Sequence, residues 1–356
     1  MDKDYLSKLF INEAKPSLSR HSGSGGGGDS REALRNFLAV MNCTKLFANY
    51  AGESVDSLLA FNDTSGVTDM YYMFGNCTSL TSVPELNTQN VTNMDSMFCY
   101  CESLTSVPKF DTRNVTNMDS MFYYCISLTS VPEFDTHNVT SMRGMLNSCK
   151  ALTSVPKFDT SSVTDMSTML YVCDALTSVP KFDTSSVTNM KSMFGYCASL
   201  TSVPEFDTRS VTDMSYMFIH CEVLTTVPEF DTRSVTNMSN MFNACTNLTS
   251  CLLRNIKTNL TVGSGSTYGH LLTVDSLIHL VYELRKQSSS KTLTVGTANL
   301  EKLASVYVKL VDITDEMRAA DDLIDEKYPF VVCESTDEGA MLITDYASDY
   351  KTWVIK

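Results

Sequence analysis

A 24-residue repeat constrains the fold of this chain more than any other feature of its sequence. Val-Thr-x-Met recurs eight times at this interval without insertion, and in every copy a second Met follows after three residues and a Cys after seven. The copies begin at Val67, Val91, Val115, Val139, Val163, Val187, Val211 and Val235. A unit this short cannot bury its apolar side chains alone, so successive copies must stack on one another. The sequence therefore predicts a solenoid.

Within one repeat, the spacing of apolar residues predicts a short helix followed by an extended segment. In the second copy, positions i, i+3, i+4 and i+7 are occupied by Met94, Met97, Phe98 and Cys101, one stripe of a helix. The segment 104–107 then places Leu and Val toward the interior. Pro108 cannot donate to a β-ladder, and Asp111 is expected to close the coil as an Asx-turn.

The repeat motif resembles a known family. Leu-Thr-Ser-Val-Pro-x-Phe-Asp-Thr-x-x-Val-Thr-x-Met-x-x-Met-Phe-x-x-Cys is similar to the BspA-like leucine-rich-repeat proteins of bacterial surfaces and of phages that infect gut bacteria. The resemblance covers residues 62–252 and implies a right-handed α/β solenoid that binds or displays and does not catalyse. Val-Pro stands where many members carry a longer Leu-Asp-Leu stretch, so the strand should be short.

The N-terminal residues predict an anchor segment joined to the repeats by a flexible linker. Residues 1–21 carry a small apolar group (Leu6, Leu9, Phe10 and Ile11) without the basic start and long apolar core of a secretory signal peptide. A Gly/Ser-rich linker follows at 22–30 and predicts a flexible tether, although an expression linker would have the same composition. The segment around Pro16 resembles the start of structural proteins from tailed phages. We therefore expect these residues to attach to a larger particle.

The flanks of the repeats are expected to cap the solenoid. Residues 31–61 should form an N-terminal cap with a helix, or else Met41–Leu46 is a degenerate repeat. Residues 253–356 form the expected C-terminal cap, with helices at 273–284, 299–310, 312–325 and 338–350 and strands at 291–295, 330–333 and 353–355. Parts of this region resemble the ending of phage-encoded BspA-like proteins. The expected fold class is thus an α/β, leucine-rich-repeat-type solenoid of eight 24-residue coils with a flexible N-terminal tether and an α/β C-terminal cap.

Composition excludes several classes of function. The formal net charge of −14 argues against nucleic-acid binding, which needs a basic surface. No run of about 18 apolar residues exists, so no membrane insertion is expected. The sequence lacks the phosphate-loop, nucleophile-elbow and His-Glu-x-x-His motifs. We expect no enzyme activity and no cofactor.

Two columns, each formed by the same position in successive copies of the repeat, could bind a metal ion or form disulfides. Both have simpler explanations. The Cys column offers one thiol per coil, whereas a metal needs three or four converging ligands, so buried free thiols are expected and disulfides are the alternative. Cys99 could be an exposed exception. The Asp column from Asp111 to Asp231 could suggest calcium, but turn formation explains it. The charged residues after each Pro alternate enough in sign to form a roughly neutral ladder.

Two variable columns supply the candidate contact residues. The position before each Cys includes Tyr100, Tyr124, Tyr196 and His220, and the first position after each Asp-Thr pair includes Arg113, His137, Arg209 and Arg233. Exposed Tyr and Arg are typical of contact surfaces, although solvated positions also drift freely.

These features together predict a non-enzymatic structural and adhesive protein. The specific hypothesis is a phage virion appendage, such as a head fibre, decoration protein or tail-associated fibre. Its N-terminus would bind a capsid or tail protein, and its solenoid would bind a host-surface or mucosal glycan or protein. A homo-oligomer located in the virion is expected. The alternative is an adhesin on the bacterial cell surface.

Overall fold

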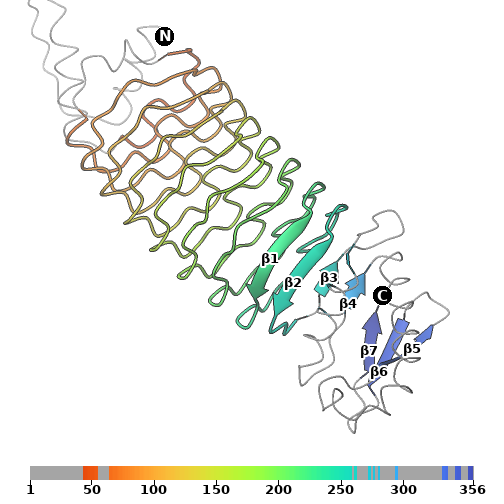
Figure 1. Ribbon diagram of the computed structural model, residues 1–356. Helices are drawn as coiled ribbons and strands as arrows, with labels where there is room; N and C mark the ends of the chain where they lie inside the picture. The colour runs from red at the N-terminus through yellow and green to blue at the C-terminus, as the bar shows by residue number, and fades with distance from the viewer. Residues whose placement is uncertain are drawn as a thin grey trace, which may run out of the picture.

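The repeats stack as successive coils of a solenoid (Figure 1). The computed structural model describes residues 43–54, 64–258, 260–262, 272–273, 276 and 280, together with strands in the C-terminal region. Equivalent residues of neighbouring coils form parallel β-bridges 24 residues apart, from Asp69↔Asn93 through to Asp213↔Asn237. The prediction of a repeat solenoid is therefore confirmed.

Each repeat begins with linked β-turns and not with a helix. In the second copy, the amide of Met97 donates to the carbonyl of Met94 at 3.2 Å, and that of Cys101 donates to Phe98 at 3.0 Å. The third residue of each of these two turns has a positive φ, 57° at Ser96 and 61° at Tyr100. An α-helix does not accept such residues. The predicted helix of each repeat, and with it the α/β class of the solenoid, is wrong. We call the eight residues from the first Met to the Cys the turn segment.

Alternate amides of the turn segment bind the next coil. The amide of Ser96 donates to the carbonyl of Asp119, and the amide of Phe98 donates to that of Met121, each at 2.8 Å. The same pattern recurs in the following repeats, always from one coil to the coil after it. Turns within a coil and hydrogen bonds between coils thus alternate along the backbone, which satisfies these polar groups without a helix.

The turn segment directs its Met, Phe and Cys side chains into one continuous core. Met118, Met121 and Phe122 are fully buried, as are their equivalents in the neighbouring repeats. Phe98 stacks on Phe122 with ring centroids 5.5 Å apart and on Phe74 at 5.3 Å. Each fully buried side chain of this size contributes about 1.5–3 kcal/mol. The core therefore depends on contacts between coils.

Buried hydroxyls and thiols also join the coils. Thr112 Oγ1 donates to the carbonyl of Asp135 at 2.8 Å, and Cys125 Sγ donates to that of Phe98 at 3.1 Å. The eleven cysteines described by the structure are buried and free. Cys99 is one of them, with 7% of its surface exposed, so the expectation that it stands exposed is wrong.

Within the described coils, regular strand pairing appears at the last two. Strands β1 (Thr226–Asp231) and β2 (Ser250–Arg254) pair in parallel, with a register shift between Val227 and Phe230. Pro228 lies at this shift, because its nitrogen cannot donate to the ladder. The first six repeats also carry Pro at this position, whereas the eighth has Leu252, which agrees with the expected shortness of the strand in the repeats that contain Pro.

The residues before the first full repeat follow the same backbone pattern. The amide of Cys43 donates to the carbonyl of Asp69 at 3.0 Å, and φ is positive at Lys45 and Asn49. Residues 43–50 therefore form a turn segment, which is the degenerate repeat left open as an alternative above. The predicted anchor and linker, residues 1–30, lie outside the described residues.

A second sheet follows the solenoid. Its strands are β3 (Leu260–Val262), β4 (Leu293–Val295), β5 (Val331–Ser335), β6 (Met341–Asp345) and β7 (Thr352–Ile355), in the order β3-β4-β7-β6-β5. The β3–β4 and β4–β7 pairs are parallel, and the other two are antiparallel. The strands expected at 291–295, 330–333 and 353–355 correspond to β4, β5 and β7. The helix expected at 338–350 is wrong, because β6 lies there. No helix of the described chain has the length and apolarity to cross a membrane.

Candidate recognition surface

The turn segments place a row of aromatic side chains along one edge of the solenoid. The two residues before each Cys lie outside the row of inward Met, Phe and Cys side chains, and in several repeats they are exposed or partly exposed. We define the aromatic edge as Tyr100, Tyr123, Tyr124, Tyr171, Tyr196 and His220. The row extends from the second to the seventh repeat.

Tyr100, Tyr123 and Tyr124 form the first cluster of the aromatic edge. The Tyr100 ring lies 5.3 Å from Tyr123 in an edge-on arrangement and 5.2 Å from Tyr124. Tyr100 is 38% exposed, the largest value among the bulky apolar side chains described. Desolvation, and then the neighbouring Tyr123 hydroxyl, raise the pKa of Tyr100. These rings hold one another in place while leaving apolar surface open.

The second cluster contains Tyr171, Tyr196 and His220. The Tyr171 and Tyr196 rings meet edge-on at 5.4 Å, and His220 stacks on Tyr196 at 4.6 Å. His220 Nδ1 lies 3.7 Å from Glu222 Oε1. Tyr196 is 37% exposed. The structure thus brings Tyr100 together with Tyr124, and Tyr196 together with His220, among the residues predicted from the sequence.

The fourth repeat connects the two clusters. Asn147 and Ser148 occupy the aromatic positions in this coil, and each is only 7% exposed. Ser148 Oγ donates to Asn147 Oδ1 at 2.8 Å. Tyr123 also contributes, after burial and Tyr196, to the raised pKa of Tyr171 across this coil. The two clusters therefore lie on one edge of the solenoid, separated by one coil with polar side chains at the aromatic positions.

The predicted Arg and His candidates lie on a different turn of the coil. Each bonds the Asp two residues before it: Arg113 Nη2 lies 2.8 Å from Asp111, His137 Nδ1 lies 2.6 Å from Asp135, Arg209 Nη2 lies 2.6 Å from Asp207, and Arg233 pairs with Asp231. Hydrogen bonds from these side chains lower the pKa of Asp111, Asp135 and Asp207. The polar groups of these side chains are thus largely satisfied within their own turn.

The Asp column shapes these turns, as predicted. The amide of Ser161 donates to Asp159 Oδ1 at 3.1 Å, and the amide of Ser185 donates to Asp183 Oδ1 at 3.0 Å. Each is an Asx-turn. Among the described residues, no three His, Cys, Asp or Glu side chains are arranged to hold a metal ion.

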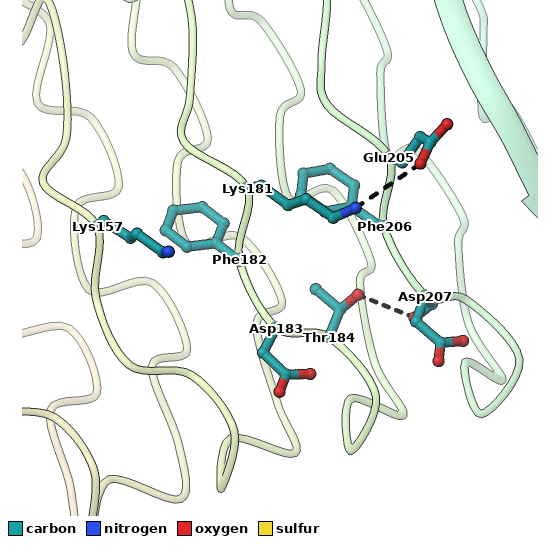
Figure 2. Close-up of a pocket in the computed structure, with 8 residues that line it drawn as sticks. All are labelled: Lys157, Lys181, Phe182, Asp183, Thr184, Glu205, Phe206 and Asp207. Atoms are coloured by element: carbon teal, nitrogen blue, oxygen red, sulfur yellow. Dashed lines mark hydrogen bonds and ion pairs between the residues drawn. The ribbon is translucent and has the colours of Figure 1, made fainter.

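A shallow groove crosses the extended segments of three repeats. Its lining residues, drawn in Figure 2, are Lys157, Lys181, Phe182, Asp183, Thr184, Glu205, Phe206 and Asp207. Lys181 Nζ lies 3.7 Å from Glu205 Oε2, and Thr184 Oγ1 donates to the carbonyl of Asp207 at 2.9 Å. The groove thus mixes both signs of charge over phenylalanines that belong to the core. This pattern favours no single class of ligand.

Comparison with known proteins places the repeats in a family. The family described as "Mycoplasma protein of unknown function, DUF285" matches residues 41–155 and 150–256, more than half of the chain. The chain belongs to this family. A solved structure with similarity to the DUF285 protein is a leucine rich cell surface protein from Faecalibacterium prausnitzii A2-165, at 18% identity and a TM-score of 0.21, covering 54% of this chain and 76% of the other. No curated protein matches.

Sequence reasoning missed two of the six residues of the aromatic edge of this DUF285 protein. Tyr123 and Tyr171 stand two residues before their Cys, whereas only the residue immediately before the Cys was taken as variable. The column of Tyr123 also varies, with Gly75, Asn147 and Ile219 among its members. Comparing both columns would have found these residues. The predicted anchor residues, Leu6, Leu9, Phe10 and Ile11, lie outside the described chain.

Proposed function

We propose that this DUF285 protein is a non-catalytic recognition protein that binds a surface ligand through its aromatic edge. The carrying observation is the pair of exposed rings, Tyr100 and Tyr196, each packed within a cluster of further aromatic side chains. Aromatic residues are enriched at recognition surfaces because they offer large contact areas with a polar tip. Elsewhere the exposed positions of the described repeats are mostly Thr, Ser and charged residues.

The scaffold suits recognition because it fixes the positions of these rings before a ligand binds. The amide of Tyr100 donates to the carbonyl of Tyr123 at 2.7 Å, and the amide of Tyr196 donates to that of Ile219 at 2.6 Å. Both backbone positions are therefore bonded to the next coil. A preorganised ring loses little conformational freedom when a ligand binds. The edge can bind without rearrangement of the solenoid.

Removing the rings tests this function. The variant with Tyr100→Ser, Tyr124→Ser and Tyr196→Ser should lose about tenfold or more of its attachment to target cells, about 1.4 kcal/mol. A matched variant, with Arg113→Ser, His137→Ser and Arg209→Ser on the other turn, should attach like the unchanged protein. Thermal unfolding establishes that both variants are folded. Undiminished attachment of a folded Tyr variant contradicts the proposal.

The finer proposal places the protein on a phage particle as a homo-oligomeric appendage. Residues 1–21 would bind a capsid or tail protein, and the 22–30 linker would separate this anchor from the solenoid. The resemblance of both chain ends to phage proteins supports this placement. The alternative is a bacterial cell-surface adhesin. Mass spectrometry of purified particles and of peptides shaved from intact bacteria distinguishes the two, because the protein should be found in only one of these fractions.

A further inference from the structure

Resting on the recognition function proposed above, we infer that the ligand of the aromatic edge is a neutral, linear carbohydrate chain lying along the solenoid axis. The inference depends on three properties of the edge: the direction in which its rings follow one another, the hydroxyl groups beside them and the absence of charge among them.

The rings follow the axis at the spacing of the coils. Coils joined by backbone hydrogen bonds rise by about 4.8 Å, and ring centroids lie 5.2 Å apart between Tyr100 and Tyr124 and 4.6 Å apart between Tyr196 and His220. A pyranose ring has a comparable length, and its apolar C–H face can pack against the exposed parts of these rings, whose faces are partly covered by neighbouring rings, as Tyr196 is by His220. A linear chain can therefore place successive sugars on successive coils.

Hydroxyl groups run beside the rings. The third residue of the first turn in each segment forms a neighbouring column that includes the partly exposed Ser96, Ser120 and Thr168 and the buried Ser192. Hydroxyls both donate and accept hydrogen bonds, as do the hydroxyls of a sugar. An aromatic row beside a hydroxyl column matches a ligand with an apolar face and polar edges.

The aromatic edge is free of fixed charge. The two positions before each Cys hold no Asp, Glu, Lys or Arg in any of the eight repeats. His220 is the single titratable cation among these positions, and it lies against Glu222. An anionic polymer would find no cationic row here and would meet a chain of net charge −14. Charge complementarity therefore favours a neutral chain.

The length of the ligand gives the sharpest test. Full-length protein is titrated by calorimetry with neutral gluco-, galacto-, manno- and N-acetylhexosamine oligosaccharides of increasing length. At least one series should gain affinity with length until the chain spans both clusters, and then level off, because added sugars find no further rings. The variant Tyr171→Ser with Tyr196→Ser should level off at a shorter length. Tyr100→Phe with Tyr196→Phe keeps the rings and should keep most of the affinity.

Treatment of the target separates this inference from the proposed function. Attachment to mucin and to bacterial cells is measured after periodate, which cleaves sugar diols, and after protease. Attachment that is lost with periodate and survives protease is the expected result. Attachment that depends on the tyrosines but is lost with protease alone overturns the carbohydrate and keeps the recognition function. Attachment that does not need the tyrosines overturns both the carbohydrate ligand and the recognition function. If the aromatic edge instead binds a second copy of this chain, the protein would form an oligomer that depends on the tyrosines and would bind no oligosaccharide.

Discussion

At the scale of single residues, the buried thiols act as hydrogen-bond donors. Cys125 Sγ and the amide of Cys101 both reach the carbonyl oxygen of Phe98, at 3.1 Å and 3.0 Å, so this oxygen uses both lone pairs. Burial raises the pKa of Cys125 well above its usual value, and the pKa of Cys43 to about 12. Each Cys of the column thus packs like a small apolar side chain, and its thiol keeps its proton at neutral pH.

This burial predicts a loss of stability at alkaline pH. Above about pH 8.5 the thiols ionise in the unfolded chain but stay protonated in the folded one, so the unfolded state binds fewer protons and stability falls as pH rises. Each buried thiol whose pKa is raised should lower the free energy of unfolding by about 1.4 kcal/mol per pH unit until its folded pKa is reached. Urea unfolding at pH 8, 9 and 10 measures the slope. Cys99, with a folded pKa of about 11, provides the comparison, because Cys99→Ala should reduce the slope by one thiol. A midpoint that does not change over this range contradicts the prediction.

At the scale of the structural element, the turn segment explains both the success and the failure of sequence reasoning. The inward positions of the second copy, Met94, Met97, Phe98 and Cys101, have the spacing of a helical stripe, and the prediction that they form the core is correct. Linked turns bury the same positions, so the apolar spacing cannot distinguish the two structures. The distinguishing feature is positive φ at residues such as Ser96 and Tyr100, which carry no glycine signal. Propensity alone does not reveal it.

The aromatic edge was only partly predictable for a related reason. Variation between copies identified Tyr100 and Tyr196, since outward positions can vary while the core stays constant. It could not show that Tyr123 packs on Tyr100, because this contact joins neighbouring coils. The Arg113 column varies equally in sequence, and only its ion pair with Asp111 distinguishes it from the edge. Variation between the repeat copies thus identified residues that point outward, and the structure shows which of these residues contact one another.

Positive φ predicts opposite effects at two equivalent positions. Ser120 has a φ of 52°, and its equivalent in the next repeat, Gly144, has a φ of 60°. Ser120→Gly should stabilise the protein by about 0.5–1 kcal/mol, because a left-handed backbone costs a residue with a Cβ more than it costs glycine. Gly144→Ala should destabilise it by about 1–2 kcal/mol, and the new Cβ would lie 3.3 Å from Ser120 Oγ. Chemical denaturation measures both, and equal effects of the same sign would refute the backbone assignment.

A charge in the core should break the element. Met121 is fully buried, so Met121→Asp places an unpaired carboxylate among apolar side chains and should unfold the neighbouring coils. Its neighbour Ser120 is partly exposed, and Asp tolerates the left-handed backbone, so Ser120→Asp should remain folded. Circular dichroism and thermal unfolding compare the two variants. Similar stability of both would refute the inward placement of Met121.

At the scale of the whole molecule, the solenoid is nearly one-dimensional. Each described coil bonds to the coil before it and the coil after it, and the core passes through the stack without interruption into Leu260, Leu272 and Leu280. Stability in such an array is approximately a sum of coil and interface terms. The amide of Thr273 also donates to the carbonyl of Thr249 at 2.8 Å, so the residues after the repeats join the last coil directly.

This architecture predicts that one full coil can be removed. Deleting residues 163–186 joins Ser162 to Val187 and keeps every later residue in register, so the protein should fold with a modestly lower unfolding temperature. Deleting residues 163–174 removes half a coil and should prevent the later repeats from docking. Thermal unfolding followed by circular dichroism compares the two deletions. A full-coil deletion no more stable than the half-coil deletion would contradict the nearest-neighbour description.

The direction of the hydrogen bonds between turn segments gives the solenoid two chemically different ends. Each bond runs from an amide of one coil to a carbonyl of the coil that follows. Along this face, a cut between coils therefore leaves a row of donors on one surface and a row of acceptors on the other, whereas bonds such as that from the amide of Thr116 to the carbonyl of Thr92 run the opposite way elsewhere on the coil. Like surfaces cannot pair, whereas unlike surfaces are complementary. An uncapped stack would consequently associate head to tail through this face and grow as an open filament, because a closed two-fold pair would set donors against donors.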